Sequence, residues 1–233
     1  MYIAGLKSFF GKKEPTRHFV SYPKSGRTWV RYTLRLLEAD QKFRFHHDGH
    51  EFNDGSRPSL DTDIQRRLSQ YSNVDRIVYM ERDPRDVMVS LYHQVTGRFG
   101  DIFQYEGTMS EFVRDPYFGA ESLRRFRDMW HEIARKRSVL AIRYEDMKAA
   151  PESTISTILD YAEISRDAAW IEKSCQESEI DKMRAAEKGR MVQEGWLQPK
   201  NGYTKVRKGR VGGHREEMED RDIAYLDSIF GPY

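Results

Sequence analysis

Short apolar runs that alternate with stretches of helical periodicity constrain the fold of this chain more than any other feature. Three runs rich in β-branched and aromatic residues predict buried strands at His18–Tyr22, Arg76–Glu81 and Val139–Arg143. A helical pattern follows each run, and strands that alternate with helices build parallel βαβ units. We therefore expect an α/β fold of three layers, with a central, mainly parallel sheet covered by helices on both faces. No linker rich in Pro, Gly or Ser divides residues 1–233, which are expected to form a single domain.

The predicted helices are recognised by apolar stripes and by capping residues. An apolar stripe with helical spacing begins at Val30, after the first strand. Asp83 is a suitable N-cap after the second strand, with Pro84 at the first helical position. Pro151 opens a helix after the third strand, and regularly spaced apolar residues predict a further helix over Ser122–Arg137.

Composition and charge limit the classes of function. Lys+Arg 39 against Asp+Glu 37 leave a net charge of +2, which gives no support for nucleic-acid binding. The single cysteine, Cys175, excludes an intramolecular disulfide and a cysteine-rich zinc site, and it suits a reducing cytosol. The first residues do not resemble a secretory signal, and no apolar run approaches the roughly 18 residues of a membrane span. A soluble, cytoplasmic protein without a membrane span is expected.

The turn of residues 22–29, with the sequence YPKSGRTW, joins the first strand to its helix and predicts an anion site. Such a turn directs backbone N–H groups and the positive end of the helix toward one point. Gly26 lets a ligand approach the backbone closely, while Lys24, Ser25 and Thr28 add donors. The strand–loop–helix is P-loop-like, yet the nucleotide-binding motif G-x-x-x-x-G-K-[ST] is absent. The alternative is an ordinary turn with a solvated lysine.

The run YPKSGRTW resembles the 5′-phosphosulfate loop of the sulfotransferases that use 3′-phosphoadenosine 5′-phosphosulfate (PAPS). The resemblance implies donor contacts from the second part of the loop: Lys24, Ser25, Gly26, Arg27, Thr28 and Trp29. Arg27 departs from the pattern, because the family often has threonine there, and it adds a cation on the 5′ side.

A second segment, Val78–His93, resembles the 3′-phosphate motif of the same family, in which an arginine ends a strand and a serine follows on a helix. In this sequence these residues are Arg82 and Ser90, which we expect to converge on one phosphate. The alternative is that Arg82 pairs with Asp83 or Asp86 and that Ser90 is only packed.

Three further segments follow in the family's order. Tyr144, in the run RYEDM, resembles the tyrosine near the adenine, although a tyrosine there could also seal the sheet edge. Ser178 and Ile180 stand where the family's adenine-side segment usually has Thr and Phe. The run VRKGRVGG of residues 206–213 resembles the RKGxxG loop that closes over the 3′-phosphate. It implies contacts from Arg207, Lys208 and Gly209, with a solvated basic loop as the alternative.

Departures from the pattern occur near the C-terminus. Gly213-His214 stands where Asp-Trp is usual, which leaves the end of this loop open. The dimerisation motif of the animal enzymes is not recognisable, and the chain is shorter than those enzymes.

The resemblance implies a sulfotransferase that moves a sulfuryl group in line from PAPS to an acceptor hydroxyl or amine, leaving PAP, without a metal. Such catalysis depends on positioning and on charge stabilisation at the leaving oxygen. The catalytic candidates are Lys24 beside the bridging oxygen, His47 as general base, and Ser90. Because His46 and His50 are near neighbours of His47, a slip of one residue would move the base to His46. A metal site at these histidines is disfavoured, since no partners with zinc spacing exist.

Two other functions stay open from the sequence, a P-loop-type kinase and a catalytically silent nucleotide-binding protein. A kinase predicts a Walker lysine and a magnesium carboxylate, and neither occurs in the expected order. The acceptor is expected to be a small molecule or a glycan, and nucleic acid is not expected as a partner. Five aromatic residues form either an acceptor pocket or part of the core: Phe99, Phe103, Tyr105, Trp196 and Tyr203.

Overall fold

The computed structural model describes residues 16–57, 62–189, 195–231 and 233. Its sheet has four strands in the order β2-β1-β3-β4, and every neighbouring pair is parallel. The strands are β1 (Arg17–Ser21), β2 (Arg44–His46), β3 (Arg76–Glu81) and β4 (Leu140–Arg143). The predicted α/β class with a parallel sheet is confirmed, and the three predicted strands lie within one residue of their expected bounds.

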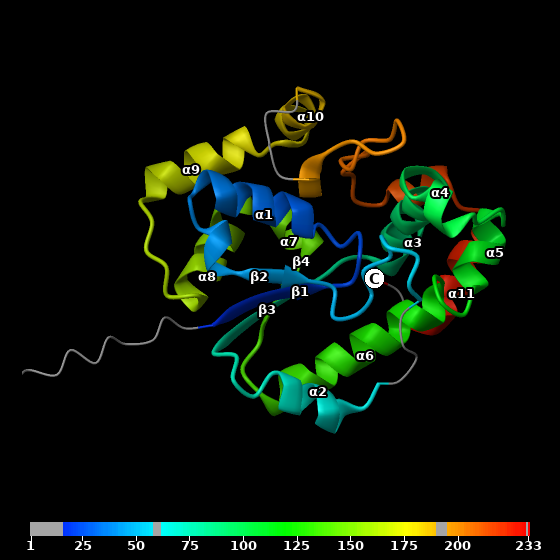
Figure 1. Cartoon of the computed structure of the whole chain (residues 1–233), viewed down its shortest axis with the longest axis horizontal. Coiled ribbons are helices and arrows are strands. Elements are labelled where there is room, and N and C mark those ends of the chain that lie inside the picture. Colours follow the sequence, from blue (N-terminus) through cyan, green and yellow to red (C-terminus); the bar gives the residue numbers. More distant parts are fainter. Residues whose placement is uncertain (1–15, 58–61, 190–194, 232) are drawn as a thin grey trace, which may run out of the picture.

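Helices cover both faces of the sheet (Figure 1). On one face lie α1 (Arg27–Leu36), α7 (Tyr144–Ala149), α8 (Pro151–Tyr161) and α9 (Ala168–Glu177), with α10 (Ile180–Lys188) beyond α1. The opposite face carries α2 (Ile64–Gln70) and α6 (Ala120–Lys136). Beyond the carboxyl ends of the strands lie α3 (Pro84–His93), α4 (Gly100–Phe103), α5 (Met109–Arg114) and α11 (Asp220–Phe230).

The hydrophobic core consists of two main clusters, one on each face of the sheet. Phe19 and Val78 are fully buried toward α1 and α8, whereas their neighbours Val20 and Tyr79 are buried toward α6. This alternation follows from the two-residue period of a strand, and it explains why the strand sequences are apolar on both faces. Each such side chain contributes on the order of 1.5–3 kcal/mol when buried.

The local signals for helices also hold. The side chain of Asp83 accepts a hydrogen bond from the backbone N–H of Arg85 (2.9 Å), and Pro84 opens α3 as predicted. Pro151 likewise opens α8. The short helix α7 was not predicted, because its six residues are too few to show an apolar period.

All four carboxyl ends of the strands meet at one edge of the sheet, which is where ligands bind in open parallel sheets. Among the described residues, no helix has both the length and the apolar character needed to cross a membrane. Residues 1–15, on which the expectation about secretory signals rests, lie outside the described part of the chain.

Candidate functional site

A cavity of about 630 Å³ lies at the carboxyl edge of the sheet, between the loops that follow the strands and the segment of residues 195–213. Every residue selected from the sequence lines it except Ser25, whose side chain is buried. The lining members of that set are Lys24, Gly26, Arg27, Thr28, Trp29, His47, Arg82, Ser90, Tyr144, Ser178, Ile180, Arg207, Lys208 and Gly209. Segments far apart in the sequence therefore share one cavity.

The loop between β1 and α1 has a backbone shape that few sequences permit. Gly26 caps α1 with φ 103°, and a Cβ there would lie 2.5 Å from a ring carbon of Tyr144. Glycine is required by both the conformation and the close approach. Lys24 also has a positive φ, 70°, which costs free energy for a residue with a Cβ. Arg27 and Thr28 occupy the first turn of α1, whose N–H groups point toward the cavity and form an anion site.

Lys24 lies in a cationic environment. The pKa of its ammonium is lowered from 10.5 to about 7. Burial is the largest cause, the charges of Arg98, Arg82 and Arg207 act in the same direction, and the charge of Glu187 opposes them. The pKa of Lys24 is thus close to physiological pH, so its charged and neutral forms coexist. An anion in the cavity would favour the charged form.

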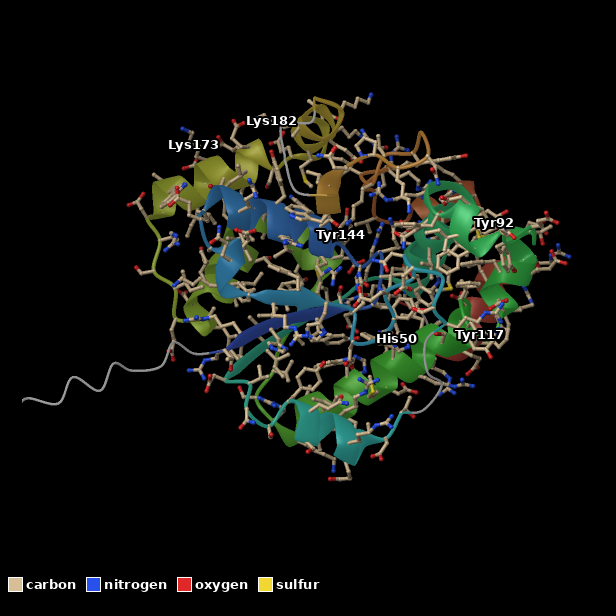
Figure 2. The ribbon with its side chains drawn as sticks, in the orientation of Figure 1. His50, Tyr92, Tyr117, Tyr144, Lys173 and Lys182 are labelled. Carbon is tan, nitrogen blue, oxygen red and sulfur yellow. The ribbon has the colours of Figure 1, made fainter. Side chains whose placement is uncertain are left out.

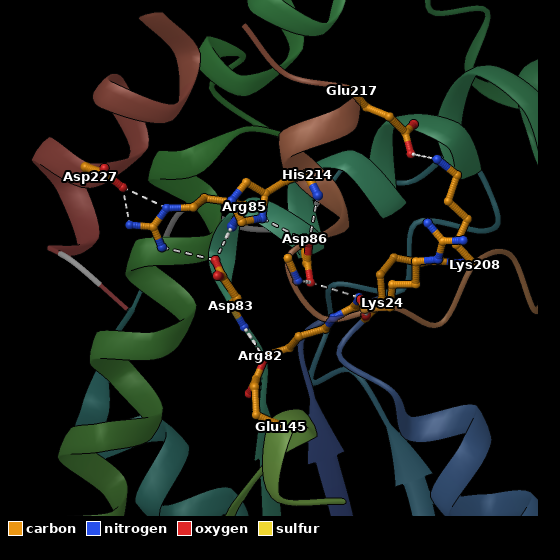
Figure 3. Close-up of polar contacts among 12 residues, drawn as sticks. Lys24, Arg82, Asp83, Arg85, Asp86, Glu145, Lys208, His214, Glu217 and Asp227 are labelled. Atoms are coloured by element: carbon orange, nitrogen blue, oxygen red, sulfur yellow. Dashed lines mark hydrogen bonds and ion pairs between the residues drawn. The ribbon is translucent and has the colours of Figure 1, made fainter. Parts of the chain in front are cut away.

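Arg82 lies between the first loop and α3 (Figure 3). Its guanidinium donates to the carbonyl oxygens of Lys24 (3.3 Å) and Arg210 (2.7 Å) and pairs with Asp86 (3.2 Å). It also stacks over the ring of Tyr144, 4.2 Å from the centroid. The alternative pairing with Asp86 is therefore present, yet Arg82 lines the cavity, and its buried Nε–H has no hydrogen-bond partner. Ser90, further along α3, lines the same cavity.

Asp86 fixes the C-terminal loop onto α3. Its carboxylate accepts hydrogen bonds from the backbone N–H groups of Gly212 and His214 and from Nδ1 of His214, each at 3.0 Å. Burial alone would raise the pKa of Asp86, but His214 and Arg82 hold it below the usual value. His214, one of the two residues that depart from the family pattern, thus has a definite structural role: with Gly212 it docks the loop on Asp86.

The cations of the basic loop are half-exposed and pair with acidic side chains. Glu217 accepts from Arg207 (2.6 Å) and Lys208 (2.9 Å), and these cations, with His93, lower its pKa to about 2 although burial opposes this. Gly209 has φ 60°, and a Cβ there would lie 2.1 Å from the Cδ1 atom of Ile180. The positive φ favours glycine there, and Ile180 would have to change its side-chain conformation to admit a larger residue.

Tyr144, Trp29 and Ser178 line one side of the cavity, and Figure 2 shows Tyr144 beneath α1. The ring of Trp29 lies edge-on to that of Tyr144, with 5.9 Å between centroids. Nε1 of Trp29 donates to the hydroxyl of Ser178 (3.2 Å), which itself donates to the carbonyl of Cys175 (2.9 Å). The Ser178 hydroxyl is thus engaged in holding α9 to α1.

Comparison with known protein families decides the family. The profile of a family described as "Sulfotransferase domain" matches residues 68–232. This chain belongs to the sulfotransferase domain family. The match contains β3, β4 and the loop of residues 206–213, whereas Lys24 and His47 precede it.

Individual relatives are distant. "Sulfotransferase 1C2" of Rattus norvegicus is 26% identical over 192 residues, which are 70% of this chain and 64% of the rat protein. The chain thus spans less than two thirds of that relative's length. "Cytosolic sulfotransferase 13" of Arabidopsis thaliana is 27% identical over 237 residues, covering 85% of this chain and 70% of the plant protein. The fold is similar to the crystal structure of mouse sulfotransferase SULT7A1 complexed with PAP, with a TM-score of 0.68, 20% identity and coverage of 94% and 83% of the two chains.

His47 of this sulfotransferase domain follows β2 and faces the cavity. Its Nδ1 lies 2.7 Å from the carbonyl oxygen of Ser21, which can only accept, so Nδ1 carries the proton and Nε2 is left as an acceptor. The backbone N–H of His47 donates to Glu51 (2.8 Å). Burial first, and then the charge of Arg27, lowers the pKa of His47 well below its usual value, which keeps the imidazole neutral.

The two neighbouring histidines point elsewhere and do not line the cavity. His46 is engaged on both nitrogens, accepting from the backbone N–H of Asp48 (3.2 Å) and facing Nδ1 of His18 (3.1 Å). His50 packs against Phe126 of α6 with 5.0 Å between ring centroids, and Figure 2 shows it next to that helix. Within the described ranges, no group of three or more His, Cys, Asp or Glu residues could hold a metal ion.

The sequence did not identify several residues in and behind the cavity. Arg98 ends a π-helical turn (Gln94–Arg98), Lys205 precedes the basic loop, and Glu187 of α10 is buried behind both. A π-turn is frequent at functional sites, but only the backbone reveals it. Of the five aromatic residues expected to form either pocket or core, Phe99 and Trp196 line the cavity. Phe103 and Tyr105 pack on the core, and Tyr203 is exposed.

Proposed function

We propose that this chain transfers a sulfuryl group from PAPS to the hydroxyl, or amine, of a small-molecule or glycan acceptor and releases PAP. The observation that carries the proposal is the tautomer of His47, which leaves Nε2 as an acceptor on a residue that lines the same cavity as Lys24 and the N-terminus of α1. A proton acceptor and a phosphate site in one cavity are what such a transfer needs. The name of the Arabidopsis relative and of the mouse protein, the latter in complex with PAP, support the same chemistry.

The chain's residues fit a nucleotide with two phosphate ends. The loop around Gly26 and the first turn of α1 would hold the 5′ end. Arg82 and Arg207 would hold the 3′-phosphate, because both have a buried Nε–H without a hydrogen-bond partner. Tyr144 and Trp29 offer ring edges and faces for the base.

The donor supplies an activated sulfuryl group, and the residues of the chain would handle the proton and the charge. The acceptor oxygen forms a bond to sulfur while the bond between sulfur and the bridging phosphate oxygen breaks. Nε2 of His47 takes the acceptor proton, and the ammonium of Lys24 stabilises the negative charge that develops on the bridging oxygen. Ser90 adds a hydroxyl donor from α3.

We also propose where the protein acts and which partners it lacks. The protein acts in the cytoplasm as a single domain, as the plant relative's name and the absence of disulfide-forming cysteine pairs suggest. No nucleic acid is involved, since the net charge is only +2.

Calorimetry with PAP tests the donor site directly. We expect one site that needs no metal and that weakens about tenfold or more on Arg82→Ala or Arg207→Ala, because each removes a charged phosphate donor. Unchanged affinity in both variants would refute the 3′-phosphate assignment. Preferential binding of ATP with magnesium would favour a kinase, and tight PAP binding without turnover of PAPS in an acceptor screen would favour a silent nucleotide-binding protein.

A further inference from the structure

The part of the cavity around His47 is where an acceptor would lie, because the acceptor oxygen must reach Nε2. Its walls come from three segments: the loop after β2, the end of the π-helical turn with Phe99 after it, and residues 195, 196, 205 and 206. Two aromatic residues, Phe99 and Trp196, contribute to these walls. Charged residues also line this end, and most of them are cations.

Three cations lie at this acceptor end: Arg27, Arg98 and Lys205. The charge of Arg27 lowers the pKa values of both His47 and Lys205, and the charge of Arg98 lowers that of Lys205, so the three lie within one electrostatic neighbourhood. Burial is the first cause of the low pKa of Lys205, and Lys24 and Arg31 add to it. The carboxylate that faces the same space is Glu51.

The partners of these cations do not balance their charge. Nζ of Lys205 donates to a carbonyl oxygen, that of Trp196, at 2.6 Å. Nη1 of Arg98 forms an ion pair with the buried carboxylate of Glu187 at 3.8 Å, but at this distance it makes no hydrogen bond and stays available to a ligand. Nη1 of Arg27 is likewise buried without a hydrogen-bond partner. Burying a charged donor without a hydrogen-bond partner is unfavourable, so such groups are typical of ligand sites.

The proposed donor site has its own cations. Its 3′-phosphate faces Arg82 and Arg207, its 5′ end faces the helix N-terminus, and Lys24 serves the bridging oxygen. Arg98 and Lys205 come from other segments and are surplus to that set. A neutral acceptor would leave the ammonium of Lys205, whose Nζ donates to a carbonyl oxygen, without a counter-charge.

On the basis of the proposed function, we propose that the acceptor is itself an anion: a hydroxyl compound that carries a carboxylate, phosphate or sulfate bound by Arg27, Arg98 and Lys205. The planar guanidinium groups of Arg27 and Arg98 suit two oxygens of such a group, and the ammonium of Lys205 supplies a point charge. The ring of Trp196, with the Arg31 guanidinium 4.5 Å from its centroid, forms a firm wall beside them.

Two pairs of probes that differ in charge, the first of them nearly isosteric, test this inference by binding. Calorimetry on PAP-saturated protein compares 4-hydroxyphenylacetate with its amide, and glucose 6-phosphate with glucose. We expect the anionic member of at least one pair to bind about tenfold more tightly or better, which corresponds to about 1.4 kcal/mol. Equal affinity within both pairs, or no detectable binding of either anion, overturns the inference.

Two variants from different segments assign the preference to residues. Arg98→Gln and Lys205→Gln should each reduce the preference for the anion several-fold while PAP affinity stays within about twofold. Arg221→Gln is the matched control, because its side chain is exposed on α11 and pairs with Glu219. If the variants lose PAP affinity instead, the cations serve the donor and the inference is wrong. If the parent chain does not bind PAP, the proposed function itself fails, which is a distinct result.

Discussion

At the scale of single residues, Lys24 combines a left-handed backbone conformation, burial and a pKa lowered to about 7. If Lys24 stabilises the leaving group, Lys24→Ala should lower kcat at saturating PAPS by about 10²-fold or more and reduce PAP affinity less. Lys24→Arg should restore the rate only in part, because a planar guanidinium places its charge differently from an ammonium. A normal kcat in Lys24→Ala would reduce Lys24 to a phosphate anchor.

The pKa of Lys24 also predicts how donor binding depends on pH. Above about pH 7 the free protein carries neutral Lys24, and binding of an anion then requires uptake of a proton. PAP affinity should therefore fall as pH rises from 7 to 9, by up to about tenfold per pH unit. Calorimetry across this range should show a smaller slope in Lys24→Ala. An equal slope in both proteins would assign the titration to another group, with Lys205 the nearest choice.

His47 gives the second residue-scale prediction. His47→Ala should lower kcat by about 10²-fold or more and leave PAP affinity nearly unchanged, because only proton transfer is lost. His46→Ala is the matched control, since the His46 side chain contacts His18 and Tyr71 away from the cavity. Steady-state kinetics and calorimetry measure the two effects separately. A crippled His46→Ala beside a near-normal His47→Ala would exchange the two assignments.

Sequence alone placed His47 within reach but could not choose between it and His46, because three histidines lie within five residues. The choice between the two depends on the hydrogen-bond partners of each ring. For His47 the partner is the carbonyl of Ser21 on the neighbouring strand β1, so the information is in the pairing of β1 with β2. Tautomers follow from tertiary contacts of this kind.

At the scale of elements, the strands β1, β3 and β4 and the helices α1, α3, α6 and α8 were predicted because their apolar periods and caps are local properties, whereas β2 and the helices α9, α10 and α11 were not. The contacts between these elements and the loops that dock onto them were not predicted. Asp86 looked like one of several carboxylates in the run ERDPRD, yet it receives the N–H groups of Gly212 and His214 across more than a hundred residues. Likewise, the π-helical turn that presents Arg98 has no local sequence signal.

The junction between α3 and the basic loop can be tested through Asp86. Asp86→Asn leaves one acceptor oxygen and places an amide N–H₂ against donors, so residues 207–214 should loosen. We expect PAP affinity to fall about tenfold and hydrogen exchange of the Gly212 and His214 amides to rise. Asp128→Asn, on the exposed side of α6, is the matched control. Unchanged exchange in Asp86→Asn would show that other contacts hold the loop.

At the scale of the whole molecule, the net charge of +2 conceals a strong local imbalance. Acidic and basic residues pair over most of the surface, whereas several cations converge on the single edge where four parallel strands end. The parallel sheet was predicted, and so was the edge at which ligands bind, whereas the strand order was not. The charge of the cavity was not, because Lys24, Arg98 and Lys205 become neighbours only through the fold.

This convergence should reduce the stability of the nucleotide-free protein, and Lys24→Met tests the cost. The folded-state pKa of about 7 is below the ordinary 10.5, so below pH 7 the folded chain bears the full cost of the buried ammonium. Between pH 7 and 10.5 the folded state releases the proton and the cost shrinks, and above 10.5 it is gone. Lys24→Met should therefore raise Tm at pH 6.5 by a few degrees, on a scale of roughly 2–4 °C per kcal/mol, with the gain vanishing toward pH 10.5.

Scanning calorimetry without nucleotide measures this gain, and Lys173→Met on the outer surface of α9 is the control, for which no gain is expected (Figure 2). With PAP present the order should reverse, because a ligand that binds only the folded state stabilises the parent more than a variant of lower affinity. A Lys24→Met protein that is less stable than the parent at pH 6.5, or whose gain grows with pH, would contradict the view that the cavity holds its cations at the expense of folding free energy.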